Sequence, residues 1–411
     1  MALSRAFFTD NRKRFAEGLP DNTVVFLFAG EPKRMSQDTD YRFLPDRNFY
    51  YMTGLERAGL VLVIEKKDGK VRDILYAPAH DKLGERWGGK RPDFEELTAR
   101  SGIEDVRNED AFEEDAMAAA KDTSTRIAVD GSSIMDAPRE FTDKIATLGV
   151  KPENISSRIT EMRMVKGEEE LACIREAAKV TEEALDELKK YVKPGITEYE
   201  LYTRLEFELA RRGSMLNAFE TIVSCGTNVF YLHHADPETS GDGVAQAGSV
   251  IQIDVGARYE GYCADISRVF FVGEPAGDDK RVALLGIIQR LRQAAFRFIA
   301  PGRTFAQLNS QMYDICGKWL AAQGLISDNF CVGDVQKYYW HNTSHYLGLD
   351  VHDVGPKDRA FAEGNCLAVE PGIYIPEWGI GFRIEDDVVV TSGGCELLSS
   401  GTDSLEGIIA N

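Results

Sequence analysis

The chain has 411 residues, of which 43% are hydrophobic and 28% are charged, an ordinary composition for a globular protein. Its 67 acidic residues outnumber its 48 basic residues, so the formal net charge is −19. Phosphates would be repelled over most of such a surface, which argues against a nucleic-acid partner. The length favours two domains over one.

Targeting and redox features predict a soluble, cytoplasmic protein with no membrane partner. The N-terminal region has no apolar segment followed by a small-residue cleavage site. The first strongly apolar run, at 24–29, is far shorter than the roughly 20 residues that span a bilayer. The seven cysteines are scattered without a CxxC pair, which favours free thiols in a reducing compartment and argues against a structural zinc site.

The first region, 1–155, alternates short apolar runs with helical stretches, which predicts an α/β domain. The expected strands are 23–28, 60–64, 73–77 and 126–130, and the expected helices are 93–101 and 111–121. This region has no Gly-rich phosphate loop and only one histidine, His80, so the catalytic residues are expected elsewhere. A polar stretch with a proline at 151–158 marks the domain boundary.

The second region, 156–411, repeats one plan of two helices followed by strands. In the first copy, helices are expected at 167–192 and 197–212, and strands at 221–224 and 249–257. In the second copy, helices at 278–299 and from Thr304 to just before Gly324 precede strands at 367–369 and 383–391. Both copies carry Pro-Gly-x-Thr between their helices, where the threonine can cap the second helix. Unless the motif recurs by chance, the repeat predicts a domain with pseudo-two-fold symmetry, whose two halves can share one site.

Two aspartates are expected to face each other across the first hairpin of this region. Asp254 and Asp265 each lie 5.5 positions from a turn centred between Tyr259 and Glu260, which would place them opposite each other in an antiparallel ladder. Like charges in that position repel, and aspartate is disfavoured in strands. A bound cation would offset the repulsion. Two exposed aspartates in a shifted register are the alternative.

Glu370 and Glu385 repeat the arrangement in the last hairpin. Each lies 7.5 positions from a centre between Glu377 and Trp378, within runs too apolar for a solvated edge. Arg383 lies two residues from Glu385 and therefore on the same face, where it could orient a carboxylate. Two hairpins with paired acids make a cation site the favoured interpretation.

Histidines complete this pattern, because five of the six fall in the second region: His233, His234, His341, His345 and His352. The clustering of the last three favours a functional role, whereas a structural role is favoured for His234. Four carboxylates and an imidazole suit Mn, Co, Fe or Zn better than Cu or an iron–sulfur cluster. Two divalent ions would neutralise four carboxylates. Held about 3.5–4 Å apart, they can lower the pKa of a shared water toward about 7, which is typical of a hydrolase.

At these residues the chain resembles the Xaa-Pro aminopeptidases (aminopeptidase P), within the pita-bread metallopeptidases that include prolidase and methionine aminopeptidase. The segments that carry the resemblance are IQIDVGARYEGYCADISRVF, HNTSHYLGLDVHDVG, AVEPGIYI and GFRIEDDVVV. It continues into the first region through RMSQDTDYRFLPDRNFYYMTGLE, which sets the chain apart from methionine aminopeptidase. The resemblance implies an α+β pita-bread catalytic domain over 156–411. The α/β domain over 1–155 would serve substrate access or oligomerisation.

By position, the resemblance implies two divalent metal ions, most commonly Mn²⁺, with Co²⁺ or Zn²⁺ as alternatives. The implied ligands are Asp254, Asp265, His345, Glu370 and Glu385. Glu370 would also act as the general base for the water that attacks the peptide bond.

The same resemblance implies roles for neighbouring residues. His233 and His352 match substrate-binding histidines, although a longer segment before Asp254 leaves His234 as an alternative to His233. His341 and Arg383 match supporting or proton-handling positions. Two aromatic residues are implied as well, with Tyr374 lining the pocket for the proline ring and Trp87 reaching the site of a neighbouring subunit.

The implied activity is release of the N-terminal residue from peptides that have proline in the second position. The implied partners are such peptides and further copies of the chain, in a homodimer or homotetramer whose interface could include the YYMTG segment. An Xaa-Pro dipeptidase (prolidase) shares every ligand and is the first alternative. A non-catalytic peptide- or protein-binding module on the same fold is a remote one, because it would be expected to lose metal ligands and all five are present here.

Overall fold

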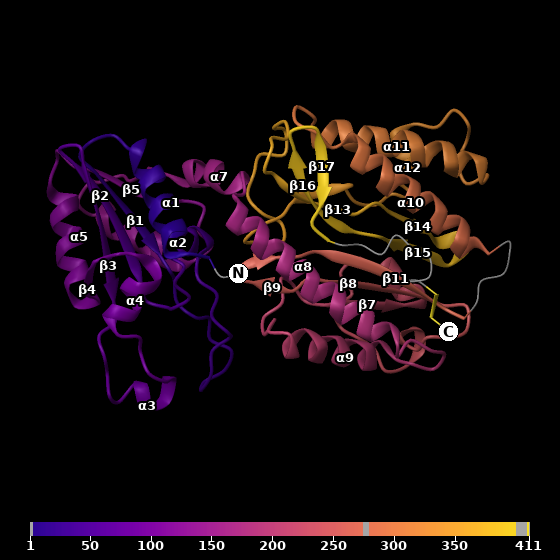
Figure 1. Ribbon diagram of the computed structural model, residues 1–411, viewed down its shortest axis with the longest axis horizontal. Coiled ribbons are helices and arrows are strands. Elements are labelled where there is room, and N and C mark those ends of the chain that lie inside the picture. The colour runs from indigo at the N-terminus through magenta and orange to yellow at the C-terminus, as the bar shows by residue number, and fades with distance from the viewer. Residues whose placement is uncertain (1–2, 274–278, 400–408, 411) are drawn as a thin grey trace. The chain divides into compact units, whose positions relative to one another are not determined.

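The computed structural model describes residues 3–273, 279–399 and 409–410, which form two compact units (Figure 1). One unit covers 2–163 and the other covers 164–411. This division falls at the end of helix α7 (Ser156–Met164), whereas the sequence placed the boundary before it. The reason lies in two arginines of α7. Arg158 Nε donates to the Phe15 carbonyl at 2.9 Å, and Arg163 Nη1 donates to Asn48 Oδ1 at 2.8 Å.

The first unit is built on a six-stranded sheet in the order β4-β3-β2-β1-β5-β6. Its strands are β1 (Thr23–Phe28), β2 (Val61–Lys67), β3 (Lys70–Ala77), β4 (Asp105–Asn108), β5 (Arg126–Val129) and β6 (Glu153–Asn154). Helices α5 (Phe112–Lys121) and α6 (Asp136–Ala146) cover one face, where Phe26 of β1 meets Phe141 at 4.7 Å between ring centroids. The opposite face meets helix α1 (Arg5–Glu17), because Arg12 pairs with Asp73 of β3 at 2.7 Å.

Every strand and helix expected in this unit is present, with ends that differ by up to three residues. The sequence missed three further helices, namely α1, α2 (Arg47–Thr53) and α6. It also missed the short helix α3 (Glu85–Gly88) that precedes α4 (Phe94–Ser101). A signal for α1 was available in Ser4, whose side chain caps the helix by accepting from the Phe7 amide at 3.1 Å.

The YYMTG segment, expected as interface surface, is buried instead. Tyr50, Tyr51 and Met52 are at most 3% exposed, because α2 packs against α1. Gly54 ends α2 in the left-handed conformation with φ 67°, and an added Cβ there would lie 2.3 Å from the Phe8 ring. This segment is therefore part of the core of the first unit.

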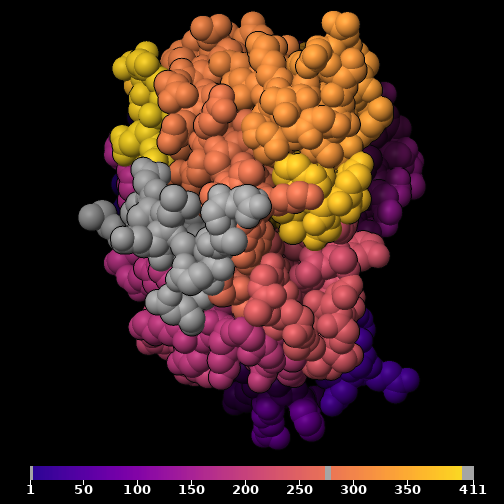
Figure 2. Space-filling model, turned by 90° about the vertical axis from the view of Figure 1, so that its right-hand side faces the viewer, coloured from indigo at the N-terminus to yellow at the C-terminus, as the bar shows by residue number. Residues whose placement is uncertain are grey.

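The second unit has two halves of the same design (Figure 2, orange half above the magenta half). In the first half, helices α8 (Glu168–Lys189) and α9 (Glu198–Arg211) pack on strands β7 (Ile222–Cys225), β8 (Val250–Val255) and β11 (Ile266–Val272). In the second, helices α10 (Lys280–Phe298) and α11 (Phe305–Ala322) pack on β13 (Cys366–Val369), β14 (Gly372–Ile375), β15 (Ile380–Arg383) and β16 (Asp386–Thr391). The expected pseudo-repeat is confirmed at its caps. Thr197 and Thr304 each begin the second helix of a half with a capping box.

Shorter elements complete the second unit. They are η2 (Gly226–Phe230), η3 (Gly241–Gly243), β9 (Arg258–Tyr259), β10 (Tyr262–Cys263), α12 (Val332–Val335), β12 (Ser344–Tyr346), η4 (Pro376–Trp378), β17 (Gly394–Leu397) and β18 (Ile409–Ala410). The two larger sheets run β18-β11-β8-β7 and β12-β13-β16-β17. The first residue of the helix expected at 278–299 lies outside the described residues. Across the described ranges, no helix combines the length and apolar character that crossing a bilayer requires.

The register expected for the first hairpin is wrong by two residues. Asp254 of β8 lies opposite Ser267 of β11, and the turn falls between Glu260 and Gly261 rather than one residue earlier. Both turn residues have positive φ, 46° and 80°, as a two-residue hairpin turn requires. Because strand side chains alternate with a period of two, this shift leaves Asp254 and Asp265 on the same face.

The register expected for the second hairpin is confirmed. Val369 lies opposite Asp386 in the β13–β16 ladder, and Gly372 lies opposite Arg383 in the β14–β15 ladder. The same register places Glu370 opposite Glu385, in the short gap between the two ladders. The halves meet here, because β15 contacts β8 and β11 and the Arg383 amide donates to Gln252 Oε1 at 2.8 Å.

Candidate metal centre

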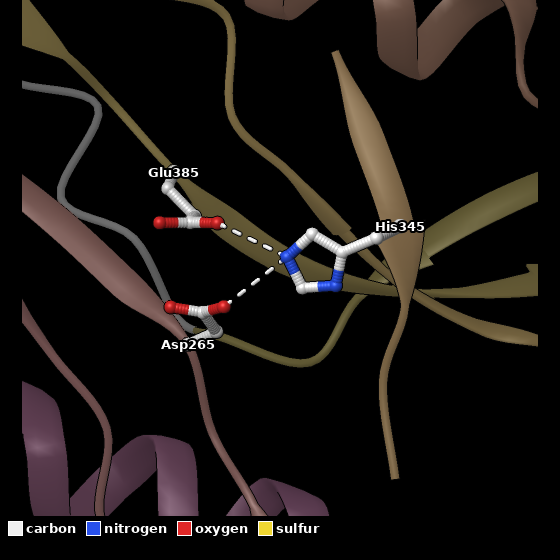
Figure 3. Close-up of side chains that lie close together, drawn as sticks. All are labelled: Asp265, His345 and Glu385. Atoms are coloured by element: carbon white, nitrogen blue, oxygen red, sulfur yellow. Dashed lines mark ion pairs between the residues drawn. The ribbon is translucent and has the colours of Figure 1, made fainter. Parts of the chain in front are cut away.

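Three side chains, in or next to different strands, converge where the two halves of the second unit meet (Figure 3). Ligand atoms of Asp265, His345 and Glu385 all lie within 4.8 Å of one another. His345 Nε2 is 3.3 Å from Asp265 Oδ2 and 3.9 Å from Glu385 Oε1. Asp265 immediately precedes β11, His345 lies in β12, and Glu385 immediately precedes β16. Two oxygen donors and one nitrogen donor therefore surround one point.

The hydrogen bond on the other side of the His345 ring fixes its tautomer. Nδ1 lies 3.0 Å from the Tyr346 carbonyl oxygen, which can only accept a hydrogen bond, so Nδ1 carries the proton. Nε2 then points its lone pair at the carboxylates of Asp265 and Glu385. A lone pair facing two carboxylates is repulsive unless a cation or a proton lies between them.

Glu370 lies at the edge of this cluster. Its Oε1 is 3.9 Å from His345 Nε2, and its Oε2 is 3.3 Å from His341 Nδ1. The Glu370 amide donates to the Thr343 carbonyl at 2.8 Å, which fixes the backbone of Glu370 just beyond the end of β13. One carboxylate can therefore face both the donor cluster and a second histidine.

The fourth acid, Asp254, is held by Arg383. The guanidinium donates to Asp254 Oδ2, whereas the buried Oδ1 has no partner among the described residues. Arg383 was expected to orient a carboxylate on its face of the sheet, and the one that it binds directly is Asp254. Its Nε also donates to Ser267 Oγ at 3.1 Å, and Ser267 Oγ donates to Glu385 Oε2 at 2.9 Å. The arginine therefore binds the acid of the other half and reaches Glu385 through a serine.

Asp387 is a buried acid that the sequence reasoning did not select. Its Oδ2 accepts the Asp265 amide at 3.0 Å, and its Oδ1 has no partner in the described part of the chain. The signal was the run Glu-Asp-Asp entering an apolar strand, since Asp387 shares a face with Glu385. Asp387 thus supports the backbone of Asp265, the first acid of the cluster.

The charge of the cluster is unfavourable in the absence of a cation. Burial, followed by the charge of Asp254, raises the pKa of Asp265 well above its ordinary value. Burial, followed by the charge of Asp265, does the same to the pKa of Glu385. Among the described residues, the only arginine or lysine within hydrogen-bond distance of Asp254, Asp265 or Glu385 is Arg383, which binds Asp254. A divalent cation would relieve the remaining repulsion.

The other histidines selected from the sequence differ in their relation to the cluster. The His352 ring stacks on His345 with centroids 4.0 Å apart and planes 13° apart, and partial burial of its ring lowers its pKa. His233 is exposed and follows Leu232, whose carbonyl accepts from Arg383 Nη2 at 3.3 Å. His234 is bound elsewhere, because its Nε2 lies 2.9 Å from Glu198, a buried carboxylate that also accepts two backbone amides. The geometry thus favours a structural role for His234.

Tyr374 and His341 form a pair beside Arg383. The Tyr374 hydroxyl lies 3.1 Å from His341 Nε2 and 3.4 Å from Arg383 Nη1. Its ring is fully buried and is covered by Trp340, which stacks on it at 4.8 Å with planes 15° apart. The aromatic surface exposed at this place belongs to Trp340, not to Tyr374, which was expected to line a pocket.

Sequence comparison finds two families. The profile of metallopeptidase family M24 matches residues 172–392, and that of the aminopeptidase P N-terminal domain matches residues 8–128. Among curated proteins, the chain is 28% identical to Xaa-Pro aminopeptidase from Escherichia coli over 97% of this chain and 95% of the relative.

Solved structures agree with this comparison. A Bacillus anthracis protein provisionally assigned as an aminopeptidase P superposes with a TM-score of 0.89 at 34% identity, covering 97% of this chain and 95% of that one. E. coli aminopeptidase P with the inhibitor Pro-Leu superposes with a TM-score of 0.87 at 25% identity, covering 97% and 96%. A zinc-substituted form of that enzyme with product gives 0.88 at the same identity and coverage.

Proposed function

The chain belongs to metallopeptidase family M24, and from this membership we propose that it is an Xaa-Pro aminopeptidase working with two divalent metal ions. The observation that carries the proposal is the cluster of Asp265, Glu385 and His345, flanked by Glu370 and Asp254. The named relatives match nearly the whole chain, including the first unit. Peptides with proline second are the proposed substrates.

The donor set fits hard to borderline divalent ions. Five side chains would hold them, namely Asp254, Asp265, His345, Glu370 and Glu385. Two structural features support this fit, namely the Oδ1 of Asp254, which has no partner among the described residues, and the lone pair of His345 Nε2. Carboxylates with one imidazole favour Mn²⁺, and Co²⁺ or Zn²⁺ would also be accepted. When bound, such ions supply an activated water and stabilise negative charge on the carbonyl oxygen.

The neighbouring side chains would serve in proton transfer, substrate binding and positioning of the ligand acids. Glu370 would accept the proton of the attacking water. Its Oε2 lies 3.3 Å from His341 Nδ1, and this nitrogen carries a proton because it donates to the Asn342 carbonyl at 2.9 Å, so His341 would act as a donor beside the Glu370 carboxylate. His352 and His233 lie on the exposed side, where a ring N–H can donate to the substrate carbonyl. Arg383 holds Asp254 in place and, through Ser267, orients Glu385.

Chelation tests the metal requirement. We expect a chelator to abolish hydrolysis of an Xaa-Pro-Xaa tripeptide and Mn²⁺ to restore it, with Co²⁺ and Zn²⁺ compared in parallel. Full activity after chelation, with no metal left by elemental analysis, would overturn the proposal. Glu370→Ala should abolish turnover, because the proton acceptor is lost. A rate close to that of the unchanged protein would refute the role of Glu370.

Substrate length separates the two peptidase alternatives. An aminopeptidase cleaves both Xaa-Pro-Xaa and longer peptides, whereas a dipeptidase of the prolidase type cleaves Xaa-Pro alone. We expect cleavage of the tripeptide, and failure on every peptide longer than two residues would favour the dipeptidase. A protein that holds no metal and cleaves neither peptide would instead be a binding module on this fold.

Assembly and location are part of the proposal. We expect a homodimer or homotetramer, and the exposed Trp87 and Leu83, 89% and 67% accessible, support a contact made by the first unit. Sedimentation that gives a monomer would remove this point. None of the seven cysteines forms a disulfide in the described part of the chain, which supports a reducing, cytoplasmic location.

A further inference from the structure

Glu198 is a buried acid that does not belong to the metal cluster. It is the first residue of α9, and its side chain is fully buried. Its Oε1 accepts the Cys225 amide at 2.6 Å and Asn228 Nδ2 at 3.0 Å. Its Oε2 accepts the Glu238 amide at 2.9 Å and lies 2.9 Å from His234 Nε2. These four partners all come from the end of β7 and the segment that follows it.

The four contacts use the full bonding capacity of the Glu198 carboxylate. An ionised carboxylate only accepts hydrogen bonds and offers about four lone-pair directions. Two backbone amides, one side-chain amide and the His234 ring occupy them, so His234 carries a proton on Nε2. The only ion-pair partner of Glu198 among the described residues is this histidine. Because a buried charge needs complete hydrogen bonding, the carboxylate holds its four partners in one arrangement.

The backbone between these partners is fixed as well. The Tyr231 amide donates to the Asn228 carbonyl at 3.0 Å, and the His234 amide donates to the Tyr231 carbonyl at 3.1 Å. These two turns join Asn228, which binds one oxygen of Glu198, to His234, which binds the other. The carboxylate therefore closes a ring of hydrogen bonds, and its loss would release both ends of that ring.

His233 lies between two residues that are held in this way. The residue before it, Leu232, has its carbonyl bound by Arg383 Nη2 at 3.3 Å. The residue after it, His234, is bound by Glu198. His233 itself is exposed, so the direction of its ring is set by the fixed backbone on either side.

His233 also lies close enough to the cluster to influence it. Burial lowers the pKa of His352, and the charges of His345 and His233 lower it further. A misplacement of about 1 Å in a group that positions the substrate can cost about 100-fold in rate. The accuracy with which the segment 225–238 is held therefore matters for turnover.

We infer that Glu198 is the positioning residue of His233, because it fixes the segment 225–238 so that the His233 ring meets the substrate carbonyl. This inference rests on the proposed aminopeptidase function and adds to it a residue outside the metal cluster. None of the four described partners of Glu198 is a proposed metal ligand. Glu198 therefore acts on the substrate only through the segment that carries His233.

Glu198→Gln tests this role in the metal-loaded full chain. The amide has the shape of the carboxylate but replaces one acceptor oxygen by a donor, which would face two other donors and displace the segment. We expect kcat/KM on an Xaa-Pro-Xaa tripeptide to fall by about 10- to 100-fold, with the metal content by elemental analysis unchanged. Asn228→Ala removes one partner and leaves the carboxylate in place, so it should cost about 3-fold.

Glu206→Gln is the matched control on the same helix. Glu206 Oε1 accepts Thr221 Oγ1 at 2.6 Å and Asn217 Nδ2 at 2.9 Å, both of which precede β7. This variant should leave kcat/KM unchanged. In the chelated protein, hydrogen exchange of the amides in 225–238 should be faster in Glu198→Gln and unchanged in Glu206→Gln.

A double variant separates positioning from general support of the fold. His233→Ala alone should lower kcat/KM at least as much as Glu198→Gln, with the same division of the loss between kcat and KM. Combining the two changes should then cost no more than His233→Ala alone, because the positioned ring is already absent.

Each outcome decides a different point. Losses that multiply in the double variant would show that Glu198 only supports the fold and would overturn the inference, as would normal turnover in Glu198→Gln. If Glu198→Gln does not fold, Asn228→Ala combined with His233→Ala gives the same comparison with the same criterion. If the unchanged protein cleaves the tripeptide and His233→Ala has no effect, only the role of Glu198 fails. If the unchanged protein cleaves no such peptide with any metal, the proposed function itself fails.

Discussion

The two acid-bearing hairpins of the second unit place their carboxylates at the metal centre in different ways. In the first, Asp254 lies inside a continuous ladder opposite Ser267, and Asp265 lies just before the strand begins. In the second, Glu370 and Glu385 both occupy the gap between two ladders that share one register. Three of the four acids thus lie where regular pairing is interrupted, and a turn or gap lets a carboxylate leave the plane of the sheet.

The hairpins also stabilise each other through reciprocal contacts. Arg383 of the second hairpin binds Asp254 of the first, and Arg268 of the first binds Asp386 of the second at 2.9 Å. Asp386 has a second basic partner, Arg292, whereas Asp254 has Arg383 alone among the described residues. The centre is therefore assembled across the two halves, and of the two reciprocally paired acids Asp254 has fewer basic partners than Asp386.

The largest effect is expected from replacing Glu385, one of the two acids in the gap between the ladders. Glu385→Gln should lower turnover by at least about 1,000-fold and reduce the metal content, because a ligand and its charge are both lost. Elemental analysis and kcat/KM on an Xaa-Pro tripeptide measure the two effects. The matched control is Glu396→Gln on β17, an exposed partner of Arg175, which should leave both quantities unchanged. Normal metal content in Glu385→Gln would contradict the assignment.

The two reciprocal arginines should differ in their effect on stability. In the chelated protein, Arg383→Ala leaves Asp254 buried and unpaired and should lower the free energy of unfolding by about 3–5 kcal/mol. Arg268→Ala should cost about 1–3 kcal/mol, because Asp386 keeps Arg292. Urea unfolding followed by tryptophan fluorescence measures both, since three of the four tryptophans lie in the second unit. Equal costs would show that the second partner of Asp386 makes no difference.

A smaller effect is expected at the serine that joins the hairpins. Ser267→Ala removes the link from Arg383 to Glu385 and should weaken metal binding by about 10-fold. Thr181→Val provides the comparison. It removes a buried hydroxyl that accepts the Ala257 amide at 2.9 Å in the first half, away from the acids. It should lower stability by about 1–3 kcal/mol without changing metal affinity. Metal titration that finds no difference between the variants would remove Ser267 from the centre.

The smallest effect is expected outside both hairpins, in the segment of the first unit around helix α3, which carries Trp87. His80 is bound by Glu85 at 2.5 Å and by Asp93 at 2.8 Å, and these hydrogen bonds raise its pKa. Its stabilising contribution is therefore complete below the unfolded pKa of about 6.5 and is lost as pH rises through the raised folded value. Hydrogen exchange of residues 81–92 should show more opening at high pH, and His80→Gln should abolish that dependence. If the exchange of residues 81–92 depends on pH in the same way in His80→Gln and in the unchanged protein, the role of His80 is contradicted.

The sequence by itself identified the four long helices of the second unit and four of the acids at the centre, but not Asp387. Periodicity and caps fixed α8, α9 and α11, because local hydrogen bonds such as those of Thr197 and Thr304 decide where these helices begin. Symmetric spacing about a turn placed Glu370 opposite Glu385. For Asp254 the same argument predicted a partner two residues before the observed one, because the position of the turn depends on which residues adopt positive φ.

Only the tertiary structure decided the partners. Ser267, Asp387 and Trp340 gain their places through contacts with residues far away in the chain, which no local pattern encodes. Arg383 shares the face expected for it, yet it binds the acid of the other half. Side-chain periodicity determines the face a residue occupies, whereas packing of the two halves determines what it meets there.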